Sequence, residues 1–407
     1  MRPSKLNIID LFAGCGGLSS GFQSVKENPY NIVLADEWDP TTAHCYKLNH
    51  PKIEVLVEDI KKVSAHRILK QTNLKKNELD LVIGGPPCQG FSNAGAHLLD
   101  DPRNQYFKEF ARIVQETNPN VVVMENVPQF VTLEKGFFYN QLVKLLTKFG
   151  YTTKAKVLLA SDFGVPQIRQ RSFVISVKKD FFDEEITFPK PTHEKIEYTL
   201  ELEKGNVIEY NNRKQNDELK KFVSVEEAIG DLPLLNPKNP VATDYKQKAF
   251  SEYQKQLRTK SKRISNHELW GHSADLLEYI SKIPEGGRMI DFYPEKQWKG
   301  KGFSQAYARL HRSGIAHTIT TFIHNPGSGR FIHYRDTRAI SIREAARLQS
   351  FNDDFVFYGS KTQQEKQVGN AVPPLLAQKI GEHVYQLVFK KSAPIGIASN
   401  LKIPIVA

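Results

Sequence analysis

Cysteine, tryptophan and methionine are scarce in this chain, with three of each among its 407 residues. Three cysteines are an odd number for a disulfide framework, so we expect a reducing compartment. Long hydrophobic runs are missing as well, because no apolar stretch approaches the ~20 residues that span a bilayer. The first residues, MRPSKLNIIDLFAG, are too briefly apolar for a signal peptide and lack a small-residue cleavage site. These absences favour a cytoplasmic protein with no membrane partner.

Acidic residues are fewer than basic ones, with 45 Asp and Glu against 56 Lys and Arg and a net charge of +11. Such an excess suits a polyanionic partner such as a nucleic acid. It is concentrated in segment 246–263, KQKAFSEYQKQLRTKSKR, which has seven basic residues and one acidic residue. A run of this kind either anchors phosphates or is an ordinary solvated face, and the composition leaves both open.

Short apolar runs alternate with amphipathic stretches through the first 180 residues. The amphipathic pattern predicts helices over 105–117 and 137–150. Near-continuous apolar strands that alternate with helices are typical of a doubly wound, mostly parallel α/β sheet. We predict strands over 6–12, 31–37, 53–59, 79–85, 120–126, 156–160 and 172–178.

This alternation stops after residue 182. Turns such as DLPLLNPKNP and HNPGSGR separate short, irregular segments as far as residue 335. Regular structure returns at 341–351 and in a terminal helix over 373–391. We therefore predict three parts: a catalytic domain with a ligand site, a second, smaller, irregular and β-rich domain, and a return segment whose last helix completes the first domain. Their bounds are 1–182, 183–335 and 336–407.

A glycine-rich turn, DLFAGCGGLSSG (10–21), follows the first strand. Ser19 replaces the third glycine of G-x-G-x-x-G, which disfavours a nicotinamide oxidoreductase. Glu37 ends the second strand and suits ribose hydroxyls, Trp38 could stack on adenine, and Asp59 at the end of the third strand could accept from the adenine amino group. Each feature alone occurs in α/β proteins without such a ligand. Together, at three neighbouring strand ends, they favour an adenosine-containing ligand.

A thiol follows the fourth strand, in GGPPCQGFS (84–92). Pro86 and Pro87 fix the backbone angle φ, so the chain turns stiffly at Cys88. The fifth strand ends in MENVPQF, where burial of Glu125 after an apolar run would raise its pKa. Either residue alone could be structural, the cysteine a packed thiol and the glutamate a cap. At adjacent strand ends, a thiolate and a proton-donating carboxyl suit attack on an electron-poor ring.

Two further segments admit two interpretations each. In VPQIRQR (165–171), Arg169 and Arg171 are expected to alternate outward as the chain enters a strand. They are either ordinary charges of a surface strand or fixed guanidinium groups that hold a base carbonyl or phosphates. The long polar loop 91–105 is either a lid that closes over the site or a solvated connection.

Taken together, these motifs resemble the C5-cytosine-specific DNA methyltransferase family, of the bacterial modification type and dependent on S-adenosylmethionine. The resemblance covers residues 10–178 and 338–376. It implies a Rossmann-like catalytic domain and a target-recognition domain at 183–335. The matching stretches stand in the family's order and are DLFAGCGGLSSG, EWD, GGPPCQGFS, ENV, QIRQR, AISIREAARLQSF and QVGNAVPP.

The resemblance also implies a role for each site residue. Cys88 would attack C6 of a flipped-out cytosine, while Glu125 engages N3 and the exocyclic amine. Arg171 would contact the cytosine O2, and Arg169 would support the pocket. No metal ion is implied. The S-adenosylmethionine site would be lined by Phe12, Gly14, Gly16, Gly17, Leu18, Glu37, Trp38, Asp59, Ile60, Pro86, Asn370 and Val372.

Double-stranded DNA is the partner that the resemblance implies, with 246–263 as a candidate phosphate anchor. It further implies a monomer near the bacterial nucleoid and a cognate restriction endonuclease encoded nearby. One alternative is a tRNA cytosine-5 methyltransferase, but the chain has no CFT tripeptide of that group and has a long recognition region. The other alternative is a non-catalytic DNA-binding relative, against which the intact Cys88, Glu125, Arg169 and Arg171 argue.

Overall fold

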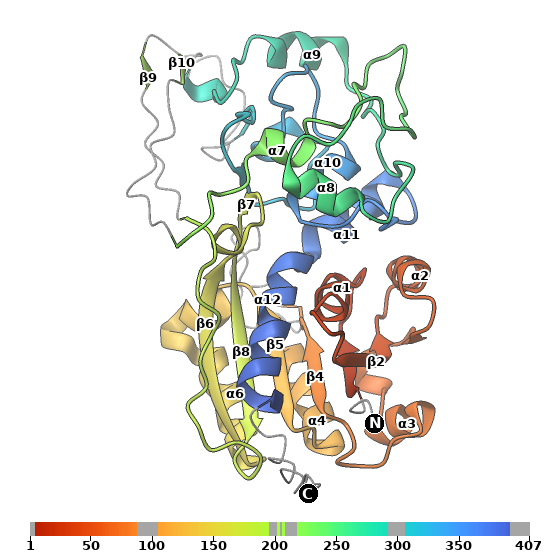
Figure 1. Ribbon diagram of the computed structural model, residues 1–407, viewed down its shortest axis with the longest axis vertical. Coiled ribbons are helices and arrows are strands. Elements are labelled where there is room, and N and C mark those ends of the chain that lie inside the picture. Colours follow the sequence, from red (N-terminus) through yellow and green to blue (C-terminus); the bar gives the residue numbers. More distant parts are fainter. Residues whose placement is uncertain are drawn as a thin grey trace, which may run out of the picture.

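The computed structural model describes residues 5–87, 105–194, 202–203, 206–207, 218–291 and 306–390. Figure 1 shows a lower lobe built around a sheet and an upper lobe of short helices and loops. Among the described residues, no helix combines the length and the apolar character that a membrane crossing requires.

Seven strands form the main sheet, in the order β3-β2-β1-β4-β5-β8-β6. The five strands from β3 to β5 run parallel, and β8 is antiparallel to both of its neighbours. The chain order reverses between β1 and β4, which is where open α/β sheets bind ligands. The strands are β1 (Leu6–Leu11), β2 (Tyr30–Asp36), β3 (Glu54–Leu56), β4 (Leu81–Gly84), β5 (Val121–Asn126), β6 (Tyr151–Leu159) and β8 (Gln170–Lys178).

The register of the central strands brings their carboxyl ends to one edge. Leu11 at the end of β1 pairs with Gly84 at the end of β4, and Gly84 pairs with Met124 of β5. All four residues of β4 and all six of β5 are buried, as expected for central strands covered on both faces. The residues that follow these strands therefore emerge side by side.

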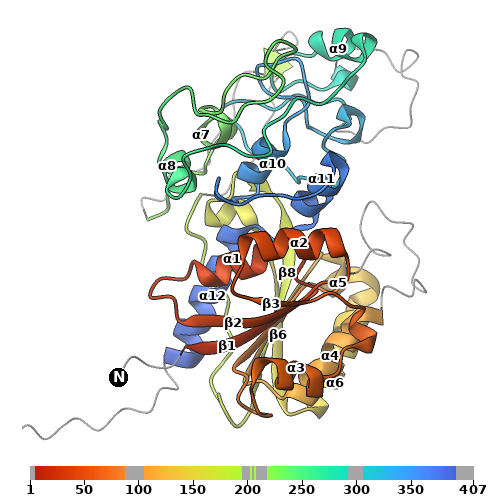
Figure 2. The same ribbon diagram turned by 90° about the vertical axis from the view of Figure 1, so that its right-hand side faces the viewer.

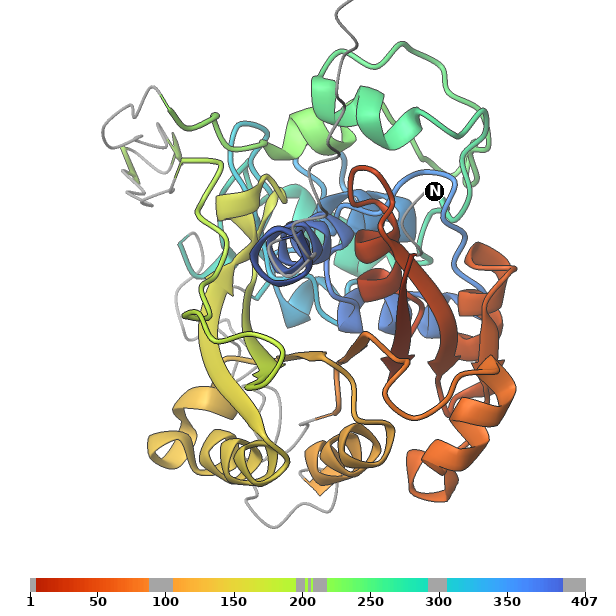
Figure 3. The same cartoon turned by 60° about the horizontal axis from the view of Figure 1, so that its bottom comes forward.

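Helices cover both faces of the sheet, so that each face has its own apolar core. Figure 3 shows the sheet between the two helical layers. One layer contains α1 (Gly17–Gln23) and α12 (Pro374–Val384). The other contains α3 (Ala65–Thr72), α4 (Tyr106–Thr117) and α6 (Phe137–Lys148). The lower lobe also includes α2 (Pro40–Asn49) and α5 (Gln129–Thr132).

The upper lobe has a third core, to which the middle segment and the return segment both contribute. Its elements are α7 (Val225–Ile229), α8 (Glu252–Arg258), α9 (Ala274–Ser281), α10 (Ile342–Leu348) and α11 (Lys361–Asn370). The short strands are β7 (Gln167–Ile168), β9 (Leu202–Glu203), β10 (Asn206–Val207) and β11 (Ala316–His317). Figure 2 shows α10 and α11 where this lobe meets the lower one.

A buried arginine joins the two segments within that core. Arg347 of α10 is fully buried and contacts Asp231, which follows α7 in the middle segment. Its Nη2 and Nε also donate to the carboxylate of Asp353, at 2.6 and 2.9 Å. Because a buried charge is stable only when it is paired, this triad fixes the middle segment against the return segment.

The predicted fold class is confirmed, and all seven predicted strands lie in the main sheet with ends shifted by a few residues. The terminal helix packs on α1, as the predicted return to the first part requires. Ahead of it, α10 and α11 pack in the upper lobe. The boundaries after 182 and 335 stay predictions.

Candidate active site and cofactor site

A buried ion pair lies at the carboxyl end of β5. Glu125 is opposite Phe173 in the antiparallel pairing with β8, so the nearby Arg171 reaches back to it. The Nε atom of Arg171 donates to Oε1 of Glu125 at 2.9 Å, with side-chain exposures of 15% and 10%. Burial raises the pKa of Glu125, and the two guanidinium groups of Arg171 and Arg169 counteract part of that rise. This carboxyl can therefore hold or share a proton nearer neutrality than an ordinary glutamate.

Asn126 ties this pair to the proline turn. Its Nδ2 donates to the carbonyl of Pro86 at 3.0 Å, and its Oδ1 accepts from the amide of Val127. A Cβ atom added at Gly85 would lie 3.1 Å from Oε2 of Glu125. The turn after β4 and the end of β5 thus form one unit, as predicted for adjacent strand ends. Asn126 was not among the site residues predicted from the sequence, although its place in the ENV motif is a signal of this role.

Cys88 lies outside the described residues, and so does the proposed lid apart from Gln105. The described chain reaches Pro87, one residue before the thiol. The role of Cys88 therefore stays a prediction that the neighbouring residues support by position.

Arg169 lies inside the protein, and the expectation that it points outward is wrong. It is fully buried, and it donates to the carbonyls of Ile319, Gly369 and Ala371 at 2.9–3.0 Å. These three carbonyls belong to segments 150 to 202 residues further along the chain. Arg171 is largely buried as well, so the interpretation of both arginines as charges of a surface strand is excluded.

The glycine-rich turn after β1 bends sharply beside the switch point of the sheet. Gly14 and Gly16 have φ angles of +57° and +99°, a region that favours glycine. A Cβ atom at Gly14 would meet nothing within 4 Å, so the backbone is open there. A Cβ atom at Gly16 would lie 2.6 Å from Nε2 of His50. The turn therefore offers bare backbone to a ligand at Gly14 and is packed from beneath at Gly16.

Glu37 is the acid that the turn engages. One carboxylate oxygen accepts from the amide of Gly14 at 3.0 Å and the other from the amide of Asp39 at 2.9 Å. Burial raises the pKa of Glu37 to about 7. Two neighbours that sequence reasoning did not single out, Asp10 and Asp36, are also buried, and each has one carboxylate oxygen without a partner in the described part of the chain.

The other predicted lining residues surround this acid. Trp38 has 70% of its surface exposed, as a flat platform beside Glu37. Asp59 caps the short helix that begins with the buried Ile60. Phe12 packs edge-on against Tyr106, at 5.8 Å between ring centroids. These residues follow β1, β2 and β3.

Leu18, Val372 and Asn370 occupy three different settings. Leu18 is buried in the core beneath the turn. The carbonyl of Val372 would lie 2.3 Å from a Cβ atom at Gly17, so this glycine is required by close packing of α1 against the return segment. Asn370 is exposed at the end of α11.

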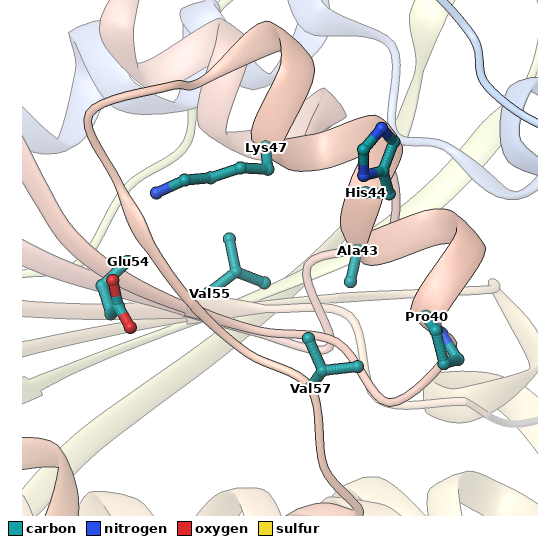
Figure 4. A pocket seen from close by; sticks show the side chains of 7 residues that line it. All are labelled: Pro40, Ala43, His44, Lys47, Glu54, Val55 and Val57. Atoms are coloured by element: carbon teal, nitrogen blue, oxygen red, sulfur yellow. The ribbon is translucent and has the colours of Figure 1, made fainter.

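The donor set fits an adenosine ligand that carries a positive charge. Glu37 can accept from a ribose diol, Trp38 offers an aromatic face, and the unpartnered oxygens of Asp10 and Asp36 lie in the same region. A separate hollow of about 300 Å³ lies between α2 and β3 (Figure 4), and its lining shares no residue with the predicted sites. It is lined by Pro40, Ala43, His44, Lys47, Glu54, Val55 and Val57.

The doubly wound sheet, with a candidate ligand site at its switch point, defines a Rossmann-like α/β fold. The sequence model of the C-5 cytosine-specific DNA methylases matches residues 6–386, and the chain belongs to this family. It is 38% identical to the type II methyltransferase M1.HphI of Haemophilus parahaemolyticus, covering 94% of this chain and 87% of that one. It is 33% identical to M.DdeI of Desulfomicrobium norvegicum, over 93% and 88%.

Solved structures of methyltransferases have a similar fold. A prophage-encoded protein from E. coli, described as a DNA modification methyltransferase, matches with a TM-score of 0.72 and 26% identity, covering 95% of this chain and all of that one. Spodoptera frugiperda DNMT2 matches with a TM-score of 0.56 and 17% identity, a likeness of fold alone. The activity is that of a DNA (cytosine-5-)-methyltransferase, which favours DNA over the tRNA alternative.

Proposed function

We propose that this enzyme transfers a methyl group from S-adenosylmethionine to C5 of a cytosine flipped out of double-stranded DNA. The observation that carries the proposal is the buried Glu125–Arg171 pair beside the turn that leads to Cys88. C5 and C6 of a paired cytosine lie within the base stack, so the base must leave the helix to reach a thiol at a sheet edge. The type II relatives support a cognate restriction endonuclease encoded nearby, and we expect a cytoplasmic monomer.

The cofactor would lie along the carboxyl ends of β1, β2 and β3. When bound, it supplies an electrophilic methyl group on a sulfonium. Glu37 would accept from the ribose hydroxyls, Trp38 would pack on the adenine, and Asp59 would accept from its amino group. The other residues proposed to line it are Phe12, Gly14, Gly16, Gly17, Leu18, Ile60, Pro86, Asn370 and Val372.

The residues at β4 and β5 would carry the chemistry on the base. The Cys88 thiolate forms a bond to C6 while Glu125 gives a proton to N3 and Arg171 donates to O2. C5 would thereby become nucleophilic and would take the methyl group as the bond from that methyl to the sulfonium sulfur breaks, which leaves a neutral thioether. The C5 proton then leaves to water, the C6–S bond breaks to return the thiolate, and the N3 proton returns to Glu125. Arg169 acts as a positioning residue, because its guanidinium donates to three backbone carbonyls.

Segment 246–263 retains part of its predicted role as a phosphate anchor. Arg258 is not free to bind a phosphate, since its guanidinium pairs with Asp231 at 2.9 Å and lies over the ring of Tyr245. The exposed cations of the segment are Lys246, Lys248, Lys255, Lys260, Lys262 and Arg263. We expect these cations to contact the DNA backbone, and we expect the residues that read the bases to lie within 183–335.

Covalent trapping tests the proposed mechanism. DNA that contains 5-fluorocytosine should form a stable adduct with the wild-type enzyme in the presence of cofactor, because C5 then carries fluorine where a proton would leave. Cys88→Ser should give no adduct and no methyl transfer, while cofactor affinity stays unchanged. The adduct is read as a band that survives denaturing electrophoresis.

Cys45→Ser is a matched control, since Cys45 is a buried thiol on α2 that packs against the upper-lobe core and lies far from the PPC motif in the chain. This variant should still form the adduct. Full methyl transfer by Cys88→Ser would refute the covalent role of the thiol.

A further inference from the structure

Segment 316–324, which we name the strap, starts beside the active site. Its first residues form β11, which pairs in parallel with β7 just before the two motif arginines. The hydroxyl of Thr318 donates to the carbonyl of Ile168 at 2.7 Å, and Arg169 donates to the carbonyl of Ile319 at 3.0 Å. The strap is therefore fixed to β7 and to Arg169, immediately ahead of β8, the strand that carries Arg171.

From there the strap follows α11, with one close contact per helical turn. A Cβ atom at Gly369 would lie 2.4 Å from the carbonyl of Thr320, so the two backbones touch. One turn earlier on the helix, Glu365 accepts from the backbone amide of His324 at 3.2 Å. The strap thus runs from the end of α11 near the active site toward its beginning.

His324 closes the strap with an oriented imidazole. Its Nδ1 lies 2.8 and 2.9 Å from the two carboxylate oxygens of Glu365. The Glu365 side chain is completely buried, whereas 42% of the His324 side chain is exposed. A buried carboxylate is costly unless it is paired with a donor or a cation. Glu365 therefore orients Nδ1–H inward and leaves Nε2 on the other side of the ring, where a protonated imidazole would present a second N–H.

The other charged groups near the ring are balanced. Trp270 lies 5.4 Å from the His324 ring, between centroids, and the ammonium of Lys361 lies 5.8 Å from the Trp270 ring. Lys361 is itself paired with Glu268 at 3.0 Å. His272 also faces His324, and its pKa is lowered mainly by burial and to a smaller extent by electrostatic repulsion from His324.

The exposed face of α11 continues this cationic surface toward the active site. Thr362, Lys366 and Asn370 are exposed at intervals of four residues, so they lie along one face of the helix. Lys366 has no ion pair within the described parts of the chain. Asn370 ends the helix next to the carbonyls that Arg169 binds. Figures 1 and 2 place α11 where the two lobes meet.

We propose that His324, positioned by Glu365, binds a backbone phosphate of the DNA next to the flipped cytosine, and that Lys366 binds a second phosphate. This inference rests on the proposed function, because it requires DNA as the substrate. The alternative is that the His324–Glu365 pair only fastens the strap to α11. A fastening role requires neither the partial exposure of the His324 side chain nor Lys366 on the exposed face of α11.

The salt dependence of DNA binding distinguishes a phosphate-binding role of His324 from a role that only fastens the strap to α11. Each phosphate that a cation neutralises contributes about −0.9 to the slope of log K against log salt. His324→Gln should make the slope shallower by about 0.9 at pH 6. His324→Lys, which keeps a cation at this position, should keep the wild-type slope at the same pH. Lys366→Gln should also make the slope shallower by about 0.9.

His66→Gln is the matched control, because His66 is exposed on α3 at the far side of the lower lobe, and its slope should equal that of the wild type. Binding is measured by fluorescence anisotropy with a labelled duplex that contains the sequence which the wild-type enzyme methylates. An unchanged slope for His324→Gln at pH 6, with wild-type binding intact, would overturn this inference alone. A wild-type protein that neither binds nor methylates DNA would overturn the proposed function together with it.

Discussion

Four carboxyl groups at the ends of β1, β2 and β5 bind protons more tightly than ordinary carboxyl groups. Burial raises the pKa of Asp10 and Glu37 to about 7 and that of Asp36 to about 8, and it also raises the pKa of Glu125. Tightly held protons at Glu125 suit a group that must donate to a base, whereas Glu37 must be ionised to accept from ribose hydroxyls.

Cofactor affinity should therefore increase as the pH rises through 7. The pKa of Glu37 is raised from 4.5 to about 7 on folding, so the stability that its neutral form supplies is present below pH 4.5 and lost as the pH rises through 7. With a pKa of about 7, Glu37 is ionised in about one molecule in ten at pH 6 and in most molecules at pH 8. A ligand that requires the ionised carboxylate can therefore bind only that fraction of the protein. We expect S-adenosylmethionine to bind roughly tenfold more tightly at pH 8 than at pH 6, by isothermal titration calorimetry.

Glu37→Gln should weaken binding at pH 8 and flatten this pH dependence, leaving only the part due to Asp10 and Asp36. Equal affinities of Glu37→Gln and the wild type at pH 8 would contradict the assignment of Glu37 to the ribose.

The motif residues of the two sites could be predicted from the sequence, but their hydrogen-bond and ion-pair partners could not. Glu37 and Glu125 stand at the ends of apolar runs, so the pattern itself shows where they emerge. The pairing of His324 with Glu365 has no such signal, because it joins residues 41 positions apart on a loop and a helix. Arg169 was placed outward because alternation along a strand does not reveal which face a second lobe covers.

Among the helices, α1 packs closely against α12. A Cβ atom at Gly21 would lie 2.4 Å from the Cβ of Ala377 and 2.5 Å from the carbonyl of Pro374. Alanine normally stabilises a helix interior by about 1 kcal/mol relative to glycine. Here the methyl group meets backbone, so Gly21→Ala should instead lower the free energy of unfolding by about 1–3 kcal/mol, measured by urea denaturation.

Gly271→Ala provides the control, because a Cβ atom there meets nothing within 4 Å. Its effect should stay within about 0.5 kcal/mol. A Gly21→Ala protein as stable as the wild type would show that α12 is not packed against α1 as closely as described.

The strands could be predicted because each is a short apolar run, buried on both faces. The role of Gly17 and Gly21 could not, since a glycine-rich turn near a predicted ligand site explains them as readily as helix packing does. Only the positions of Val372 against Gly17 and of α12 against Gly21, more than 350 residues away along the chain, show that close packing requires both glycines.

The whole molecule depends on contacts between distant parts of the chain. Arg169 joins the main sheet to the strap and α11, and Arg347 joins the middle segment to the return segment. Both arginines are buried, and both bind groups more than 100 residues away. The irregular segments of the upper lobe are held by such long-range contacts, which no local sequence pattern encodes. The strands and helices of the lower lobe could therefore be predicted from the sequence, whereas the upper lobe could be predicted only as an irregular region.

The central claim, that this chain methylates C5 of cytosine in a specific DNA sequence through Cys88, is tested most directly by bisulfite sequencing. The DNA should come from cells without cytosine methylation of their own that express either the wild type or Cys88→Ser. The account predicts that one cytosine within a single short sequence resists conversion throughout the genome in wild-type cells, and that every cytosine converts in Cys88→Ser cells. Complete conversion with the wild type, or equal protection with Cys88→Ser, would contradict it.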